Sequence, residues 1–301
     1  MNNPERREAL PSLFKDLKRY ASGEDLRRDI FRFRREVANH TWERYRPRSL
    51  NAIREGNPYV MVVYSKIHHP VAKAFAIEGM LGIAGKIKQV SDSIPDEEID
   101  LKLYEMARSF IENAAEELGA DSPHSISHAR GIFDLGREAS DKYSIEVSLT
   151  PELALVGSNF ILRMNSENNG LLDRRKGPLV AVAMEAAGKA EDKKRGDDGW
   201  MAIEFKDIKT GSLILGLNPA YADDNTLADV GETDEEGQGK KGHGEVMSEA
   251  AIALAHLHPD FALTADEVFE TVAAVYDARG KFWYELDEVI DRQMPEIWIP
   301  R

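Results

Sequence analysis

The sequence predicts an α+β protein with a helical N-terminal third, a central antiparallel sheet of about five strands, and C-terminal helices. Three observations support this fold class. Apolar residues recur at helical spacing up to about residue 119, alternate with polar residues from about residue 143, and return to helical spacing at about residue 245. Helices and strands therefore occupy separate stretches, which is typical of α+β rather than α/β proteins.

The first predicted helix spans residues 22–45. Ser22 is the expected N-cap, with Asp25 three residues later, and Pro47 breaks the pattern. One apolar stripe runs along this helix, formed by Leu26, Ile30, Phe33 and Val37.

Two further segments precede the predicted sheet. Residues 59–69 are rich in β-branched and aromatic side chains and fit either a strand or the start of a buried helix, followed by a helix from Pro70. Residues 95–119 form the clearest helix, with acidic residues in its first turn and Gly119 at its end. Its expected buried stripe consists of Ile99, Leu103, Met106, Phe110 and Ala114.

The predicted sheet begins where the period of the apolar residues falls to two. In residues 143–149, the apolar side chains of Tyr143, Ile145, Val147 and Leu149 alternate with polar ones. No helical stretch separates the following segments, so we expect an antiparallel meander. The other four predicted strands are residues 153–164, 178–186, 200–208 and 212–217.

Residues 218–244 are acidic and glycine-rich, and we expect a long, mobile loop there. Helices resume at about residue 245. Thr264 and Glu267 form a capping-box pattern at the start of a helix that Gly280 is expected to end. A last helix, residues 281–294, ends before Pro295.

Charge is distributed unevenly along the 301 residues. Residues 1–54 carry 14 basic and 8 acidic side chains (+6), and the remainder carries 25 basic and 45 acidic ones (−20). We therefore predict a basic helical arm, residues 1–57, and an α+β body, residues 58–301, that includes the loop at 218–244.

Other bulk features exclude whole classes of protein. The absence of cysteine excludes disulfides, a cysteine nucleophile and thiolate metal sites. No apolar run is long enough for a membrane span, and the N-terminus lacks the apolar core of a signal peptide. A cytoplasmic protein with no membrane contact is expected.

The basic arm is the broadest functional signal. Arginine side chains fit phosphates, and the aromatic residues interleaved with them can stack on bases, which predicts nucleic-acid binding. Alternatively, the arginines pair with acidic residues on the body of the same or a neighbouring subunit, which predicts a homo-oligomer. The arginines are Arg27, Arg28, Arg32, Arg34, Arg35, Arg44, Arg46 and Arg48.

A second signal lies in the fourth predicted strand, where alternation places Glu204 and Lys206 on one face. This Glu-x-Lys pattern resembles the second half of the signature of PD-(D/E)XK nucleases, and the resemblance covers only these few residues. In that family two carboxylates hold a divalent cation and the lysine assists the attacking water. The resemblance implies Glu185, on the preceding predicted strand, and Glu204 as Mg²⁺ ligands, with Glu204 and Lys206 as catalytic residues.

Two functional hypotheses follow. In the first, the chain associates with nucleic acid and, if it is an enzyme, is a Mg²⁺-dependent phosphodiesterase. In the second, Glu204 and Lys206 are solvated hairpin charges and the chain is a non-enzymatic, self-assembling scaffold protein without a cofactor. In that case the arginine-rich helix docks on an acidic neighbouring subunit.

Overall fold

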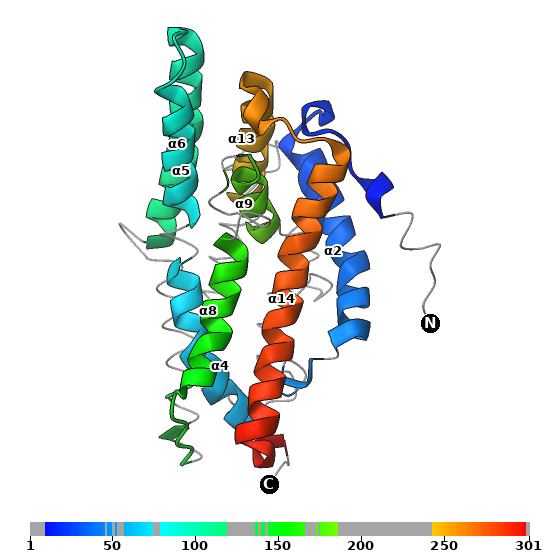
Figure 1. Ribbon diagram of the computed structural model, residues 1–301, viewed down its shortest axis with the longest axis vertical. Helices are drawn as coiled ribbons and strands as arrows, with labels where there is room; N and C mark the ends of the chain where they lie inside the picture. The colour runs from blue at the N-terminus through cyan, green and yellow to red at the C-terminus, as the bar shows by residue number, and fades with distance from the viewer. Residues whose placement is uncertain are drawn as a thin grey trace, which may run out of the picture.

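The computed structural model shows an elongated bundle of helices (Figure 1). All regular elements of the described chain are helical, so the predicted α+β class and its five-stranded sheet are wrong. Two of the predicted strands, residues 200–208 and 212–217, lie outside the residues that the structure describes. The described residues are 10–45, 47–49, 52, 57–74, 79–118, 136–137, 140–141, 144–165, 173, 175–185 and 243–298.

The elements follow one another along the chain as eight longer helices and four short 3-10 helices within the described residues. The longer helices are α2 (Gly23–Tyr45), α4 (Pro58–Ala74), α5 (Leu81–Ser91), α6 (Glu97–Leu118), α8 (Pro151–Asn165), α9 (Gly177–Glu185), α13 (His243–Leu257) and α14 (Ala265–Gln293). The short ones are η1 (Pro11–Leu13), η2 (Leu17–Arg19), η4 (Pro259–Phe261) and η5 (Pro295–Trp298).

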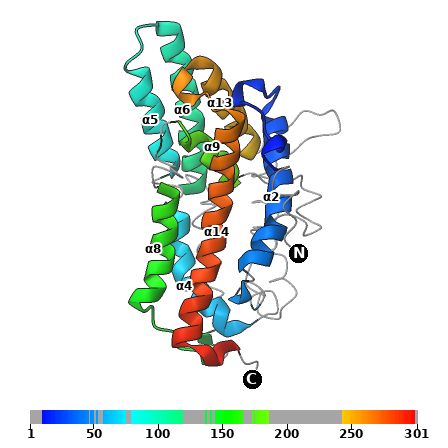
Figure 2. The same cartoon turned by 45° about the vertical axis from the view of Figure 1, so that its right-hand side comes forward.

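Helix α14 is the long axis of the bundle and packs against α2, α8 and α9 (Figures 1 and 2). Helix α13 packs against α2, α6 and α9, and α4 packs against α8. Helices α5 and α6 form a hairpin that extends beyond α13 at one end of the molecule (Figures 1 and 2). None of the described helices is both long enough and apolar enough to cross a membrane.

Helix α9 occupies a segment that the sequence predicts as a strand. Its residues Leu179 to Ala183 are all 0% exposed, because α13, α14 and α2 surround it. A segment that is buried on every side is apolar at every position, so its periodicity cannot distinguish a helix from a strand.

Helix α8 also replaces a predicted strand. Thr150 accepts a hydrogen bond at Oγ1 from the amide of Leu153 (3.3 Å), and Pro151 occupies the first helical position. A threonine cap followed by proline is a helix-start signal. The strand prediction followed from the position of the segment directly after residues 143–149, and it did not use this signal.

Residues 145–150 form no helix or strand in the structure, and Ser144 before them lies in a turn with a positive φ of 53°. The alternation still predicts which side chains are buried, since Ile145 and Val147 are 3% and 7% exposed whereas Ser144 is exposed. In place of a neighbouring strand, Lys66 of α4 donates from Nζ to the carbonyl of Val147. This segment therefore packs against a helix and not in a sheet.

Several predicted helices are confirmed. In α2 the Ser22 side chain accepts from the Asp25 amide (3.2 Å). In α6 the predicted stripe packs on the core, with Leu103, Phe110 and Ala114 fully buried. The described part of the apolar stripe of α2, formed by Leu26, Ile30 and Phe33, is also buried.

Two predictions at the C-terminus have opposite outcomes. The capping box is confirmed, because the Thr264 side chain accepts from the Glu267 amide and the Glu267 carboxylate accepts from the Thr264 amide. The expected helix end at Gly280 is wrong, since α14 continues to Gln293 and Gly280 is buried within it. Residues 59–69, for which strand and helix were both open, belong to α4.

The basic N-terminal segment packs into the bundle. Phe33 of α2 lies 5.6 Å from Phe269 and 6.1 Å from Tyr276, both on α14, and 5.4 Å from Phe14 in the preceding segment (ring centroids). Such contacts between aromatic rings stabilise the fold by more than the burial of their apolar surface alone would. The domain boundary at residue 57 stays a prediction.

Candidate association surfaces

The carboxylate–lysine site predicted from the sequence falls mostly outside the described residues. Glu185 is the last residue of α9, so its expected place on a strand is wrong. Its side chain, Glu204 and Lys206 all lie outside the described part of the chain. Their convergence into one site stays a prediction.

No metal centre is present within the described residues, where no group of three or more histidine, aspartate or glutamate side chains could hold an ion. His258, for example, has a structural role: its Nδ1 accepts from the Asp260 amide (3.2 Å) and caps η4. The described helices thus provide no support for a magnesium nuclease or for nucleic-acid binding, and the α+β assignment behind that hypothesis is wrong.

The predicted nucleic-acid-binding arginines of α2 have different surroundings. Arg27 is buried, with 8% exposure, and its Nη1 has no hydrogen-bond partner. Arg28 pairs with Asp25 at 2.8 Å, and Arg32 is exposed. The side chains of Arg34, Arg35 and Arg44, and all of Arg46, lie outside the described residues.

Arg48 docks on the C-terminal end of its own chain. Its Nη1 donates to Oδ1 of Asp291 (2.7 Å), and its guanidinium lies 4.2 Å from the ring centroid of Trp298. The Trp298 indole donates to the same Asp291 oxygen (2.7 Å). Of the two alternatives, pairing with acids of the same or of a neighbouring subunit, Arg48 therefore shows the one within its own chain.

Asp287 anchors the same segment through its backbone. It is 7% exposed and accepts the amides of Arg48 (2.6 Å) and Ser49 (2.8 Å). Burial raises the pKa of the Asp287 carboxyl, while the hydrogen bonds from Ser49 and Arg48 lower it. Because both carboxylate oxygens are occupied by backbone donors, Asp287 has a structural role.

A third polar cluster holds the N-terminal segment on α2. The Tyr20 hydroxyl accepts from the Lys15 amide (3.2 Å), and Lys15 Nζ lies 5.4 Å from the Tyr20 ring centroid. Burial raises the pKa of Tyr20, and the charge of Asp29 raises it further. Burial also raises the pKa of Asp29, whereas the charge of Lys15 lowers it. These groups stabilise the chain start against α2.

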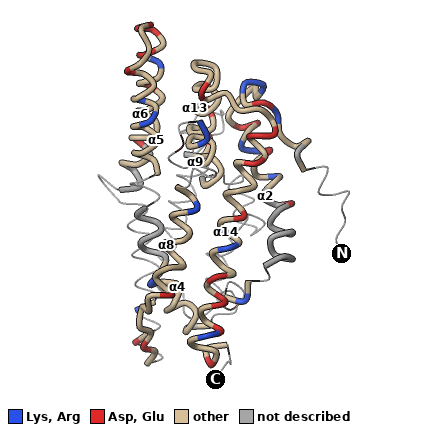
Figure 3. Tube along the Cα trace, in the orientation of Figure 1, with Lys and Arg blue, Asp and Glu red and all other residues tan. Residues whose placement is uncertain are grey.

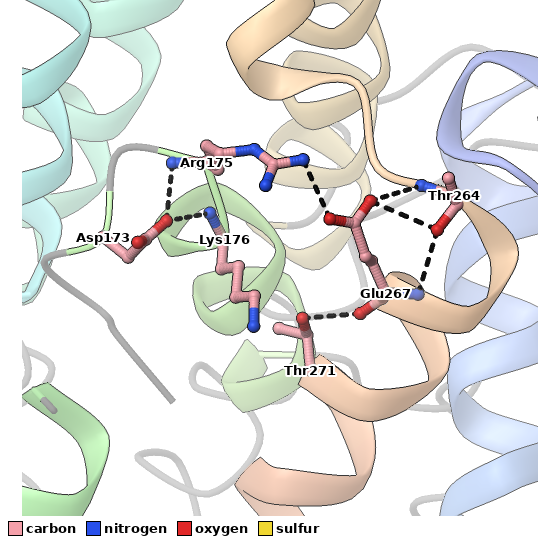
Figure 4. A network of polar contacts seen from close by, with 6 residues as sticks. All are labelled: Asp173, Arg175, Lys176, Thr264, Glu267 and Thr271. Atoms are coloured by element: carbon pink, nitrogen blue, oxygen red, sulfur yellow. Dashed lines mark hydrogen bonds and ion pairs between the residues drawn. The ribbon is translucent and has the colours of Figure 1, made fainter. Parts of the chain in front are cut away.

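A further polar network joins the approach to α9 with the start of α14 (Figure 4). Glu267 Oε1 accepts from Arg175 (2.9 Å), and its Oε2 accepts the Thr264 amide (2.9 Å). Asp173 accepts the amides of Arg175 (2.7 Å) and Lys176 (2.8 Å). The Thr264 amide, and then the Arg175 charge, hold the pKa of Glu267 below its usual value. The network thus sets the position of α9 relative to α14.

Two helices carry exposed rows of large apolar side chains, which the sequence reading missed. On α6, Leu101, Tyr104 and Ile111 are 62%, 54% and 48% exposed. On α8, Leu155 and Leu162 are 55% and 66% exposed. The sequence signal on α6 is a second apolar row at spacing i, i+3, i+10, beside the buried stripe. Contiguous exposed apolar side chains mark interaction surfaces in soluble proteins.

No protein-family model, curated protein or solved structure matches this chain.

Proposed function

We propose that this chain is a non-enzymatic, self-assembling scaffold protein, in which the outer face of α8 packs against the same face of a second copy. The observation that carries the proposal is the uncharged apolar row on α8. Leu155 and Leu162 are seven residues apart, which places them two turns apart on one side of the helix.

The neighbours of this row suit close helix packing. Ala154 and Ser158 are exposed, small and uncharged, so a second helix can approach the backbone closely. The two charged residues of α8 interact with α14 instead: Arg163 pairs with Glu285, and Glu152 forms a hydrogen bond with Gln293. An antiparallel isologous contact between two such faces keeps the two exposed Glu152 side chains at opposite ends of the interface.

The free energy gained by burying the apolar row of α8 is large enough for two copies of the chain to associate. Complete burial of one leucine side chain stabilises by about 1.5–3 kcal/mol, and a two-fold contact buries the row of each partner. Arg48, which could have served an intersubunit contact, is already bound to Asp291 of its own chain. The apolar row of α8 is therefore a better basis for assembly than the arginines.

Light scattering after size-exclusion chromatography tests the proposal. We expect the full chain to run as a dimer, and the double variant Leu155→Ser/Leu162→Ser, which removes four leucines from the contact, to dissociate at a concentration at least about a hundredfold higher than the wild type. The matched control Leu101→Ser on α6 should leave the dimer intact. A monomeric wild type, or a control that dissociates equally, would overturn the proposal.

The same measurement with short DNA and RNA distinguishes the other hypothesis. A complex that dissociates as salt rises would indicate phosphate contacts by the arginines and would favour a nucleic-acid role. The scaffold proposal expects no such complex.

A further inference from the structure

Helix α6 carries an exposed apolar row of a different kind, because acidic residues surround it. Leu101, Tyr104 and Ile111 lie on one side of the helix, opposite the buried Leu103 and Phe110. Helix α6 belongs to the peripheral hairpin with α5, and it packs against α13 on its inner side (Figures 1 and 2). Its outer row faces away from the core.

The charges beside this row are predominantly negative. The exposed acids on the described face of α6 are Glu97, Glu98, Glu105 and Glu112. Its two exposed cations are already paired within the helix, Lys102 with Glu98 (2.7 Å) and Arg108 with Glu112 (2.6 Å). No ion pair engages Glu97 or Glu105 within the described chain. Figure 3 shows acidic residues at the end of the hairpin where α6 begins.

This combination determines what can cover the row. A second copy of α6 would bring acidic residues against acidic residues, and like-charge contacts are unfavourable. A nucleic acid would be repelled for the same reason. A helix with one apolar face and flanking lysines or arginines can bury the apolar row and also pair with the acidic residues beside it.

We propose that the outer face of α6 binds a basic amphipathic helix of a partner protein. The apolar face of that helix covers Leu101, Tyr104 and Ile111, and its basic flank lies beside Glu97 and Glu105. This site lies on a different helix from the self-association face of α8, so either can exist without the other.

Three synthetic peptides of about 18 residues test the proposal, because that length gives about five helical turns. They share one leucine face and carry lysine and arginine, glutamine or glutamate on the other face. Binding to the full-length protein is measured by fluorescence anisotropy at about 50 and 300 mM NaCl. We expect the basic peptide to bind about tenfold more tightly than the neutral one, and this advantage to shrink at high salt.

Variants then locate the site. Leu101→Ser/Ile111→Ser should weaken binding of the basic peptide about tenfold, and Glu97→Gln/Glu105→Gln should reduce only its advantage over the neutral peptide. Leu149→Ser, a 50% exposed leucine that precedes α8 and belongs to neither proposed contact, is the control and should bind as the wild type does. Circular dichroism confirms that each variant keeps its helical content.

Other outcomes overturn the proposal in distinct ways. Equal binding of all three peptides would show that the acidic residues beside the row do not select a basic partner. Unchanged binding of the basic peptide to Leu101→Ser/Ile111→Ser would show that the peptide binds elsewhere than on α6. No binding by any peptide removes the site altogether. None of these results affects the dimer measurement on α8, so the two proposals fail independently.

Discussion

The backbone amide of Ser49 donates a 2.8 Å hydrogen bond to Oδ1 of Asp287, a residue 238 positions later in the chain. The second carboxylate oxygen of Asp287 accepts the amide of Arg48 at 2.6 Å. One buried side chain therefore holds the segment after α2 against the C-terminal half of α14.

Replacing Asp287 with alanine should lower the free energy of unfolding by about 2–3 kcal/mol, because the buried Ser49 amide and the partly buried Arg48 amide lose their acceptor. Urea unfolding at neutral pH measures the change. The control is Asp291→Ala, where a half-exposed carboxylate is lost and a change of about 1 kcal/mol or less is expected. Equal losses in the two variants would contradict the anchoring role of Asp287.

Gly23 of α2 lies in close contact with the backbone of α13, so we expect Gly23→Ala to destabilise the fold. An added Cβ would lie 2.8 Å from both the carbonyl oxygen of Glu245 and the amide nitrogen of Glu249, and backbone atoms cannot move aside easily. Such overpacking costs about 1–3 kcal/mol. Gly85→Ala is the control, since nothing lies within 4 Å of its added Cβ and alanine favours the helix by about 1 kcal/mol. Thermal unfolding should show opposite shifts in Tm.

The Glu267 carboxylate should make stability dependent on pH. Its pKa is lowered in the folded state, so its stabilisation is present above the unfolded pKa of about 4.3 and is lost as pH falls through the folded value. Glu267→Gln should therefore cost about 1 kcal/mol at pH 7, with the difference from wild type closing as the solution is acidified. Urea unfolding across this pH range measures it. In the control variant Glu270→Gln, which replaces an exposed acid one turn away, the free energy of unfolding should differ little from wild type at any pH. A stability difference between Glu267→Gln and wild type that persists at low pH would contradict this role of the Glu267 carboxylate.

Tyr276 fixes the C-terminal end of α9, because its hydroxyl donates to the carbonyl of Ala183 at 3.1 Å in the buried core. Tyr276→Phe leaves that carbonyl without this donor and should cost about 1–2 kcal/mol. In the control, Tyr284→Phe, the lost hydroxyl is exposed and bonded to Glu288, so the cost should be near zero. Chemical denaturation compares the two, and a Tyr276→Phe protein as stable as wild type would show that the cap is not needed.

The association surfaces illustrate one limit of reasoning from sequence. The residues Leu101 and Leu103 are both leucines on α6, yet one is 62% exposed and the other fully buried. Composition cannot say which of two apolar rows on a helix meets the core, because that depends on which helices pack beside it. The exposed row of α8 could not be predicted at all, since its segment was predicted to be a strand and residues seven apart lie on opposite faces of a strand.

Local chemistry by itself determined the start of α2 at Ser22, the capping box at Thr264 and the buried stripe of α6. These features depend on side chains that bond to their own backbone within a few residues, or on a strong helical period. Only the tertiary structure decided that residues 178–185 form a helix and that α14 continues through Gly280. Burial on every side removes the periodic signal from α9, and packing against α2, α8 and α9 outweighs the small helix penalty of one glycine.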